Sequence, residues 1–287
     1  MILVTGGAGQ VATELAARSA QVSRVGRPEF DFDRPETIAA SFDQVQPSLV
    51  VNAAAWTAVD AAEAEEAAAL RANRDGPAEL ARLCAAAGIP LVHISTDYVF
   101  DGRKGAPYVE TDPTCPTGVY GSSKLAGEQA VLSYDRAIVL RTSWVYAAIG
   151  KNFVRTMLGA AQKTKTLKVV ADQHGCPTNA GDLADAILAI AARVADGWRP
   201  DYAGIFNAAG TGSTTWHGLA LATFEEAARH GRAMPTVNPI ATADWPTPAK
   251  RPPDSRLDCS KLARVFDVHL PAWRPSLAHT VDVIITV

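Results

Sequence analysis

The feature that most constrains the fold is a glycine-rich turn close to the start of the chain. Residues 2–4 form a short apolar segment typical of a buried strand, and TGGAGQVA follows at residues 5–12, leading into a helical pattern. Glycines at Gly7 and Gly9, with Ala12 three positions on, match the fingerprint that holds a dinucleotide between a strand and a helix. The helix N-terminus would face the pyrophosphate with free N–H groups. We therefore predict a dinucleotide-binding domain here, an ordinary turn being the alternative.

The apolar segments that follow alternate regularly with helical patterns. This alternation predicts an α/β fold of the Rossmann type, a doubly wound parallel sheet, with a smaller C-terminal substrate lobe. The regular alternation of apolar segments and helical patterns ends after Tyr146. We therefore expect a dinucleotide-binding domain over 1–146, with 178–232 returning to it, and a substrate-binding lobe from 147–177 and 233–287. The expected strands cover 22–25, 49–51, 91–95, 137–140, 167–170 and 204–207, and the expected helices cover 61–73, 79–87, 120–132 and 182–195.

The bulk properties exclude several classes of protein. The net charge of −3 provides no general attraction to nucleic acid or to an anionic membrane. The four cysteines form no Cys-x-x-Cys pair, so a structural zinc site is not expected. The sequence has no signal segment and no apolar run of 18 residues. We expect a cytoplasmic protein with reduced thiols and with neither nucleic-acid nor membrane partners.

A tyrosine and a lysine lie four residues apart in YGSSK at 120–124. On a helix, Tyr120 and Lys124 share one face, and a neighbouring ammonium favours the phenolate, which lowers the tyrosine pKa. Taken alone, the pair is more typical of a solvated helix face. Thr96 ends the strand at 91–95, at the sheet edge where parallel sheets bind ligands, which favours the catalytic interpretation.

The position after the second strand carries Arg27 instead of the acidic residue that often holds an adenosine 2′-hydroxyl. A cation there favours a 2′-phosphate and hence NADPH, although NADH remains open and a solvated loop arginine is the alternative. Small residues at Asn52–Ala55 would let a flat ring approach the backbone, with plain helix–sheet packing as the alternative.

Taken together, these motifs resemble the extended short-chain dehydrogenase/reductase family and, within it, the dTDP-4-dehydrorhamnose reductases. The order and spacing of the glycine turn, Thr96 and Tyr120-x-x-x-Lys124 carry the wider resemblance. Two departures are Trp56, where Tyr or His is commoner, and Ala12 in place of glycine. The narrower resemblance rests on GQV at 9–11, NAAAWTAVD at 52–60, STDYVFDG at 95–102, LRTSWVY at 140–146, DQ-x-G-x-PT at 172–178, RP at 251–252 and SRLD at 255–258.

This resemblance implies reduction of the C4 ketone of dTDP-4-dehydro-6-deoxy-L-mannose to dTDP-L-rhamnose. Tyr120 would protonate the alkoxide, Lys124 would bind the nicotinamide ribose and lower the tyrosine pKa, and Thr96 would hydrogen-bond the carbonyl oxygen. The implied nucleotide-sugar contacts are Thr96, Phe100, Asp101, Tyr120 and Trp144. The implied cofactor contacts are Gly6, Gly9, Gln10, Val11, Arg27, Asp31, Phe32, Ala53, Ala54, Ala55, Thr57, Tyr98, Tyr120 and Lys124.

Two other functions stay open from the sequence. A nucleotide-sugar epimerase shares the Thr/Tyr/Lys set but retains NAD, and a non-catalytic subunit resembling the regulatory subunit of methionine adenosyltransferase would bind NADP without turnover. Some similar reductases bind Mg²⁺ between subunits through a glutamate on the first helix. Glu14 matches that position. An exposed helical glutamate is the alternative, so we predict no metal ligand, and the homodimer that such a site would suggest stays open.

Overall fold

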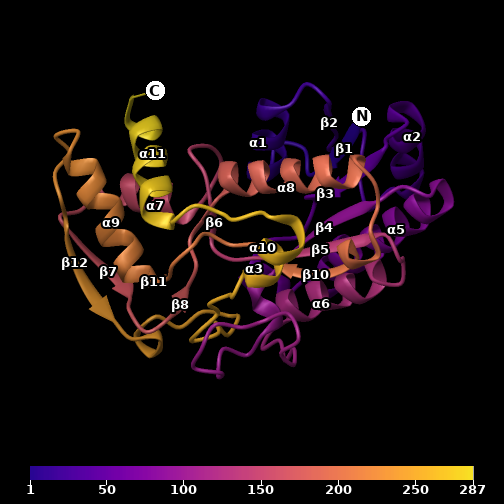
Figure 1. The fold of residues 1–287 in the computed structure, drawn as a ribbon. Helices are drawn as coiled ribbons and strands as arrows, with labels where there is room; N and C mark the ends of the chain where they lie inside the picture. Colours follow the sequence, from indigo (N-terminus) through magenta and orange to yellow (C-terminus); the bar gives the residue numbers. More distant parts are fainter. Residues whose placement is uncertain (287) are drawn as a thin grey trace.

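The computed structural model describes residues 1–286, which form a large α/β domain and a smaller lobe beside it (Figure 1). The domain is built on a parallel sheet of six strands in the order β10-β5-β4-β3-β1-β2. Because the strand order reverses at β1, the sheet is doubly wound, which confirms the predicted fold class. The strands are β1 (Ile2–Thr5), β2 (Val22–Arg24), β3 (Leu49–Asn52), β4 (Leu91–Thr96), β5 (Ala137–Thr142) and β10 (Gly204–Asn207).

Helices cover both faces of this sheet. One face buries Leu15 of α1, Ile187 of α8 and Phe266 of α10, and the other buries Ile38 of α2 and Leu80 of α5, next to α6. Strands covered on both faces are mostly apolar, and β1, β3 and β5 are buried throughout, with polar residues only at their carboxyl ends. The helices are α1 (Gln10–Arg18), α2 (Pro35–Val45), α5 (Gly76–Ala87), α6 (Val119–Val131), α8 (Ala180–Ala195) and α10 (Ser260–Phe266).

The region predicted as one helix over 61–73 is segmented, and a π-helical turn joins it to α5. The carbonyl oxygen of Asn73, in this turn, lies 1.9 Å from the place where a Cβ on Gly127 would stand. The turn therefore packs directly against the backbone of α6 and buries Asn73 completely. Such turns are frequent at functional sites. The segments are α3 (Val59–Ala62), α4 (Glu66–Leu70) and the π turn η1 (Arg71–Asp75).

The smaller lobe packs three helices against a parallel pair of strands (Figure 1). Its core contains Val154, Leu219 and Leu277, one from each helix, and a second cluster around Phe224 contacts the strand pair. The elements are α7 (Phe153–Ala161), α9 (Trp216–Ala228), α11 (Trp273–Thr286), β7 (Thr166–Val170) and β12 (Thr236–Ile240). The remaining short elements, which are spread over both parts of the chain, are β6 (Val145–Tyr146), β8 (His174–Gly175), β9 (Thr178–Asn179), β11 (Thr214–Thr215) and the 3₁₀ turns η2 (Asp97–Val99), η3 (Pro200–Tyr202) and η4 (Thr242–Asp244).

Two helices pack in a different part from the one predicted. α9 lies in the segment 178–232, which was expected to return to the sheet, but it buries Leu219 in the lobe. α10 lies in the segment 233–287, expected in the lobe, but it buries Leu262 in the sheet core. The spacing of apolar residues shows which face of a helix is buried, not which core receives it. Within residues 1–286, no helix is long and apolar enough to cross a membrane.

The contact between Gly127 and Asn73 predicts that α6 tolerates no side chain at this position. A methyl group in Gly127→Ala would force α6 and η1 apart, and we expect the free energy of unfolding to fall by about 1–3 kcal/mol, as for other overpacked sites. Gly159, on α7, is the matched control because a Cβ there meets nothing within 4 Å. Gly159→Ala should raise the free energy of unfolding by about 0.5–1 kcal/mol. Urea denaturation measures both, and an unchanged Gly127→Ala midpoint would contradict the packing.

Candidate active site

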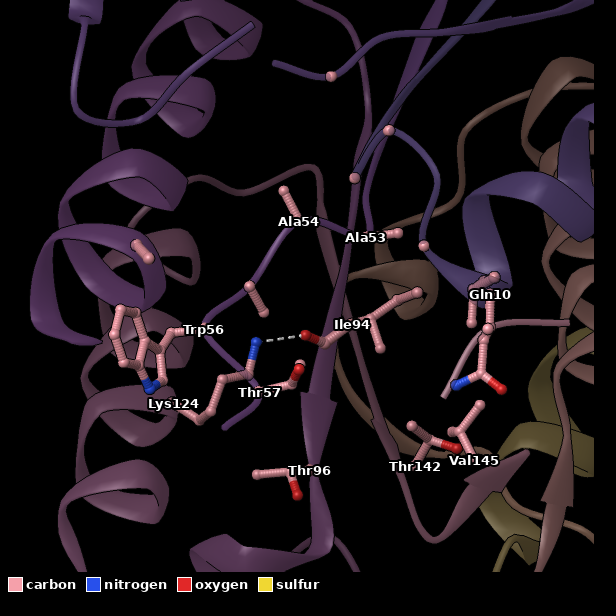
Figure 2. Close-up of a pocket in the computed structure, with 18 of the residues that line it drawn as sticks. Gln10, Ala53, Ala54, Trp56, Thr57, Ile94, Thr96, Lys124, Thr142 and Val145 are labelled. Carbon is pink, nitrogen blue, oxygen red and sulfur yellow. Dashed lines mark hydrogen bonds between the residues drawn. The ribbon is translucent and has the colours of Figure 1, made fainter. Parts of the chain in front are cut away.

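A pocket of about 920 Å³ lies at the carboxyl ends of the central strands. Figure 2 shows residues of β4, α1 and α6 together around it. The structure therefore brings together most of the predicted site, although its members are spread over the first half of the chain. The predicted residues that line the pocket are Gly6, Gly9, Gln10, Val11, Arg27, Asp31, Phe32, Ala53, Ala54, Ala55, Thr57, Thr96, Tyr120, Lys124 and Trp144. Tyr98, Phe100 and Asp101 are not among the lining residues.

The glycine turn is shaped by contact with the neighbouring strand end. Gly6 has a φ of +109°, and a Cβ on it would lie 2.8 Å from the carbonyl oxygen of Ala53. Only glycine allows this backbone approach between the ends of β1 and β3. Gly9 then serves as the N-cap of α1 without any side-chain cap hydrogen bond, and the first turn of α1 carries no acidic residue. The helix N-terminus is thus free to bind an anion.

A buried chain of hydrogen bonds ties three strands together beneath the pocket. The Thr5 hydroxyl donates to Asn52 Oδ1 over 2.6 Å, and Asn52 Nδ2 lies 2.9 Å from Nδ1 of His93. The Thr5 oxygen also accepts the backbone N–H of Ala54 at 3.1 Å. Burial lowers the pKa of His93 well below its usual value, so the ring is neutral and can accept from Asn52. His93 is fully buried within β4 and belongs to the core.

Asn73 is a site residue that the sequence reasoning missed. Its side chain accepts the N–H of Trp56 at 2.8 Å and donates to the Trp56 carbonyl at 3.1 Å and to Ser123 at 2.9 Å. It thus joins the loop after β3 to helix α6. Asn152 is a second such residue. It caps α7 and donates to Gln10 at 2.9 Å, which links the lobe to the glycine turn. Asn before an apolar helical run is an N-cap signal that could have drawn attention to Asn152.

The part of the pocket lined by Arg27 carries a cation shared between two carboxylates. Arg27 contacts Asp31 at 2.9 Å and Asp33 at 3.1 Å, and Asp33 also contacts Arg71 at 3.0 Å. The Arg27 side chain is 68% exposed, so the pairs are weak and water competes for the guanidinium. Phe32 packs over Gly76, the first residue of α5. An incoming phosphate could therefore replace either carboxylate as a partner of Arg27.

Thr96 lies between the carboxylate of Asp97 and the phenol of Tyr120. Its hydroxyl donates to Asp97 Oδ1 at 3.0 Å and accepts the N–H of Tyr98 at 3.2 Å. Asp97 is 2% exposed, and burial raises its pKa to about 6, while hydrogen bonds from Ser255, Ser143 and Thr96 oppose that rise. Asp97 is consequently mostly ionised at neutral pH, and its charge acts on the neighbouring phenol.

The pKa of Tyr120 differs from the expectation. Burial raises it to about 12, a hydrogen bond with Thr96 opposes the rise, and the charge of Asp97 adds to it. Lys124 is not among the causes of this shift, and its side-chain nitrogen donates to the Ile94 carbonyl at 2.7 Å (Figure 2). Burial lowers the pKa of Lys124 to about 8, and the nearby Glu128 opposes that fall. Helical spacing placed both residues correctly on one helix but could not show which acceptor takes the ammonium.

Three predicted site residues, Tyr98, Phe100 and Asp101, do not line the pocket. Phe100 is fully buried and stacks on Tyr108 with ring centroids 4.1 Å apart, so it belongs to a core cluster. Asp101 accepts the Tyr108 hydroxyl at 2.9 Å. The Tyr98 ring stands edge-on to Tyr120, with centroids 5.8 Å apart. None of the three lines the pocket, and Tyr98 approaches the site through its contact with Tyr120.

Trp144 lines the pocket from a strained backbone. Its φ is +47°, a left-handed conformation that is uncommon for a bulky residue. Its ring stacks on Trp216 with centroids 3.5 Å apart and an interplanar angle of 9°. Gly175 makes room for it, since a Cβ there would lie 2.3 Å from the indole. Strain of this kind is concentrated at functional sites.

Among residues 1–286, no group of three His, Cys, Asp or Glu side chains is placed to hold a metal ion. Glu14, the residue matched to a metal position, forms an ion pair with Arg18, the i+4 residue on the same helix. The Mg²⁺ suggested by the resemblance therefore has no support from the described part of the chain.

The fold and the site together define a class. The structure has the features of an oxidoreductase of the extended short-chain dehydrogenase/reductase type. These features are a doubly wound sheet, a glycine turn that opens onto a free helix N-terminus, and Thr96 beside the helix that carries the tyrosine and the lysine. The model of the RmlD substrate binding domain family matches residues 1–285. The chain belongs to this family.

Several known proteins are similar to this chain over almost its whole length. A Sinorhizobium fredii protein named dTDP-4-dehydrorhamnose reductase is 44% identical over 279 residues, covering 96% of this chain and 94% of the relative. The Escherichia coli protein of the same name is 40% identical, covering 99% and 98%. The crystal structure of a Clostridium acetobutylicum dTDP-4-dehydrorhamnose reductase has a TM-score of 0.90 at 33% identity and covers 99% of each chain. That of the Bacillus anthracis reductase in complex with NADP has a TM-score of 0.88 at 29% identity and covers 97% of each chain.

The low pKa of Lys124 predicts a pH dependence of cofactor binding. In the ribose contact that the resemblance implies for Lys124, the ammonium would be the donor form, and it loses its proton as pH rises through about 8. NADPH affinity, followed by its fluorescence, should therefore fall above that pH by up to about tenfold per unit. Lys124→Met is the control and should bind more weakly with a flat profile. The same slope in both proteins would contradict the assignment.

Proposed function

We propose that the chain binds NADPH and reduces the C4 ketone of dTDP-4-dehydro-β-L-rhamnose, giving dTDP-L-rhamnose. The observation that carries the proposal is the position of Tyr120, Lys124 and Thr96 in one pocket with the glycine turn. The relatives that match almost the whole chain, named dTDP-4-dehydrorhamnose reductases, support this substrate. The name of the NADP complex supports the cofactor.

The residues of the pocket suit a nicotinamide dinucleotide, which would supply the hydride when bound. Gly9, Gln10 and Val11 would hold the pyrophosphate, because the uncapped N-terminus of α1 opens there. Ala55 and Thr57 would line the nicotinamide side. Lys124, which also lines the pocket, would turn from the Ile94 carbonyl to the ribose hydroxyls.

The protein's own part in the chemistry is delivery of a proton. Burial keeps the proton on Tyr120 at neutral pH, so the phenol can give it to the substrate oxygen as negative charge develops there. The C–H bond forms at C4, the O–H bond forms at the carbonyl oxygen, and the phenolate regains its proton from solvent. Thr96 would orient the phenol and the carbonyl oxygen, and its hydroxyl would turn from Asp97 to do so.

The proposal predicts that Tyr120 acts in turnover and not in cofactor binding. Tyr120→Phe should lower kcat with the 4-keto sugar nucleotide by about a hundredfold or more, because the proton donor is lost. NADPH binding should stay close to that of the wild type. Tyr134→Phe is the matched control, because the Tyr134 hydroxyl donates to Ile89, away from the pocket. The loss of NADPH absorbance at 340 nm measures turnover, and NMR identifies the product.

Three outcomes would contradict this account. Normal turnover in Tyr120→Phe would remove the residue from the mechanism. No NADPH oxidation with this sugar, together with rapid use of another keto-sugar nucleotide, would exclude the substrate. Tightly retained NAD in the purified protein, with no need for external NADPH, would indicate an epimerase.

We further propose that the shared cation Arg27 sets the preference for NADPH. The 2′-phosphate would displace Asp33 from the guanidinium, whereas NADH would leave the pair intact. Arg27→Gln should therefore weaken NADPH binding by about tenfold, the worth of one charge-assisted contact, and leave NADH binding almost unchanged. Asp33→Asn should shift the ratio of the two affinities the opposite way. Titration of both cofactors measures the ratio, and a parallel loss for both would contradict the role.

A further inference from the structure

A segment from the lobe crosses to the large domain and is held there by one carboxylate. This segment, residues 241–253, follows β12 and is called the strap below. Arg251 Nη2 lies 2.8 Å from Asp60 Oδ2, and the N–H of Ala249 donates to Asp60 Oδ1 at 3.2 Å. Both partners belong to motifs noted in the sequence, 52–60 and 251–252, and the proposed chemistry gives neither Asp60 nor Arg251 a role. Asp60 lies on α3, just after the loop that lines the pocket.

The strap is fixed at both of its ends. At the lobe end, Thr242 donates from its hydroxyl to Asp172 at 2.6 Å. At the other end, Pro252 and Pro253 pack onto Gly102, where a Cβ would lie 2.7 Å from Pro253. Between these points, the strap's only helical element within the described residues is the 3₁₀ turn η4, so its course depends on such anchors.

The strap places a cation against the ring that touches the proton donor. The Arg251 guanidinium lies 5.9 Å from the centroid of the Tyr98 ring, within the range of a cation–π contact. The Tyr98 ring in turn stands edge-on to Tyr120 at 5.8 Å. The backbone of Tyr98 also fits against α6, because a Cβ on Gly121 would lie 2.3 Å from the Tyr98 carbonyl oxygen. Tyr98 therefore contacts the first turn of α6 with both its ring and its backbone.

We propose that Arg251, held by Asp60, is a positioning residue for the proton donor Tyr120 and acts through Tyr98. Arg251 touches neither Thr96 nor Lys124 in the contacts of the structure, and it does not line the pocket. Its effect is to hold the Tyr98 ring in place, so that the phenol of Tyr120 stays aimed at Thr96. The kinetic part of this proposal rests on the proposed reductase function.

Kinetics of four variants test the role. Arg251→Met and Asp60→Asn should each lower kcat by about 10- to 100-fold, the cost of a small misplacement of a reacting group. KM for NADPH should change by less than about twofold, because its binding uses other residues. The double variant should be no worse than the more impaired single one, since both changes break the same pair. Arg251→Lys should recover part of kcat, because it keeps the charge and loses the planar fork.

The chain offers a matched control. Arg199 also pairs with an aspartate, Asp201, and also lies over a tyrosine ring, Tyr202, at 5.2 Å. Arg199→Met should leave kcat unchanged, because this pair lies outside the pocket. If Arg251→Met fails to fold, Asp60→Asn and Arg251→Lys carry the test.

Hydrogen exchange provides a readout that does not depend on turnover. Asp60→Asn and Arg251→Met should speed amide exchange in residues 97–102 and 118–121, and leave residues 197–203 unchanged. Faster exchange there in the variants, together with a wild-type chain that does not reduce the keto sugar, would sink the proposed substrate and keep the positioning role. Wild-type kcat in the variants, a double variant with the product of the two single losses, or unchanged exchange in 97–102 and 118–121 would overturn the proposal.

Discussion

The site depends on the hydrogen-bonded chain that joins Thr5, Asn52 and His93 across three strands. These polar side chains are buried at 0–1% exposure, in a core where an unmade hydrogen bond costs about 1–3 kcal/mol. Each therefore holds the next in a defined register, and the Thr5 oxygen also accepts the N–H of Ala54. The glycine turn and the loop after β3 are positioned together for this reason, and the dinucleotide pocket forms between them.

The second half of the site is built by contacts between the two parts of the chain. Asn152 reaches Gln10 from the lobe, Trp144 turns its ring toward the pocket on a left-handed backbone, and Arg251 reaches Asp60 through the strap. Each contact joins residues more than a hundred positions apart or requires an unusual backbone. The contacts of the lobe consequently reach residues that we propose to hold the cofactor and to position the proton donor.

Much of the fold and of the pocket could be predicted from the sequence. Apolar runs with turn residues between them indicated the strands of the sheet, and the carboxyl-end rule brought Thr96 and the glycine turn to one edge. Most of the predicted lining residues do line the pocket. Resemblance to a family supplied their roles, and these stay predictions for the individual contacts.

The remainder depended on contacts that a linear pattern does not carry. The π turn at Asn73 exists because Gly127 leaves room for it on another helix, and α9 joins the lobe because its apolar face meets α7 and α11 there. The resemblance placed Phe100 at the substrate, but it follows the 3₁₀ turn η2 and is fully buried in the core. The pKa of Tyr120 is raised because burial and Asp97 outweigh the hydrogen bond from Thr96, a balance that spacing cannot reveal.

The central claim is that hydride passes from a nicotinamide in this pocket to C4 of the sugar. It is tested most directly by incubating the protein with dTDP-4-dehydro-β-L-rhamnose and NADPH deuterated at its transferable position. NMR of the product should find deuterium at C4 of the rhamnosyl ring, with one labelled product formed for each cofactor oxidised. Product that carries no deuterium at C4, or sugar that isomerises while NADPH stays reduced, would contradict the account.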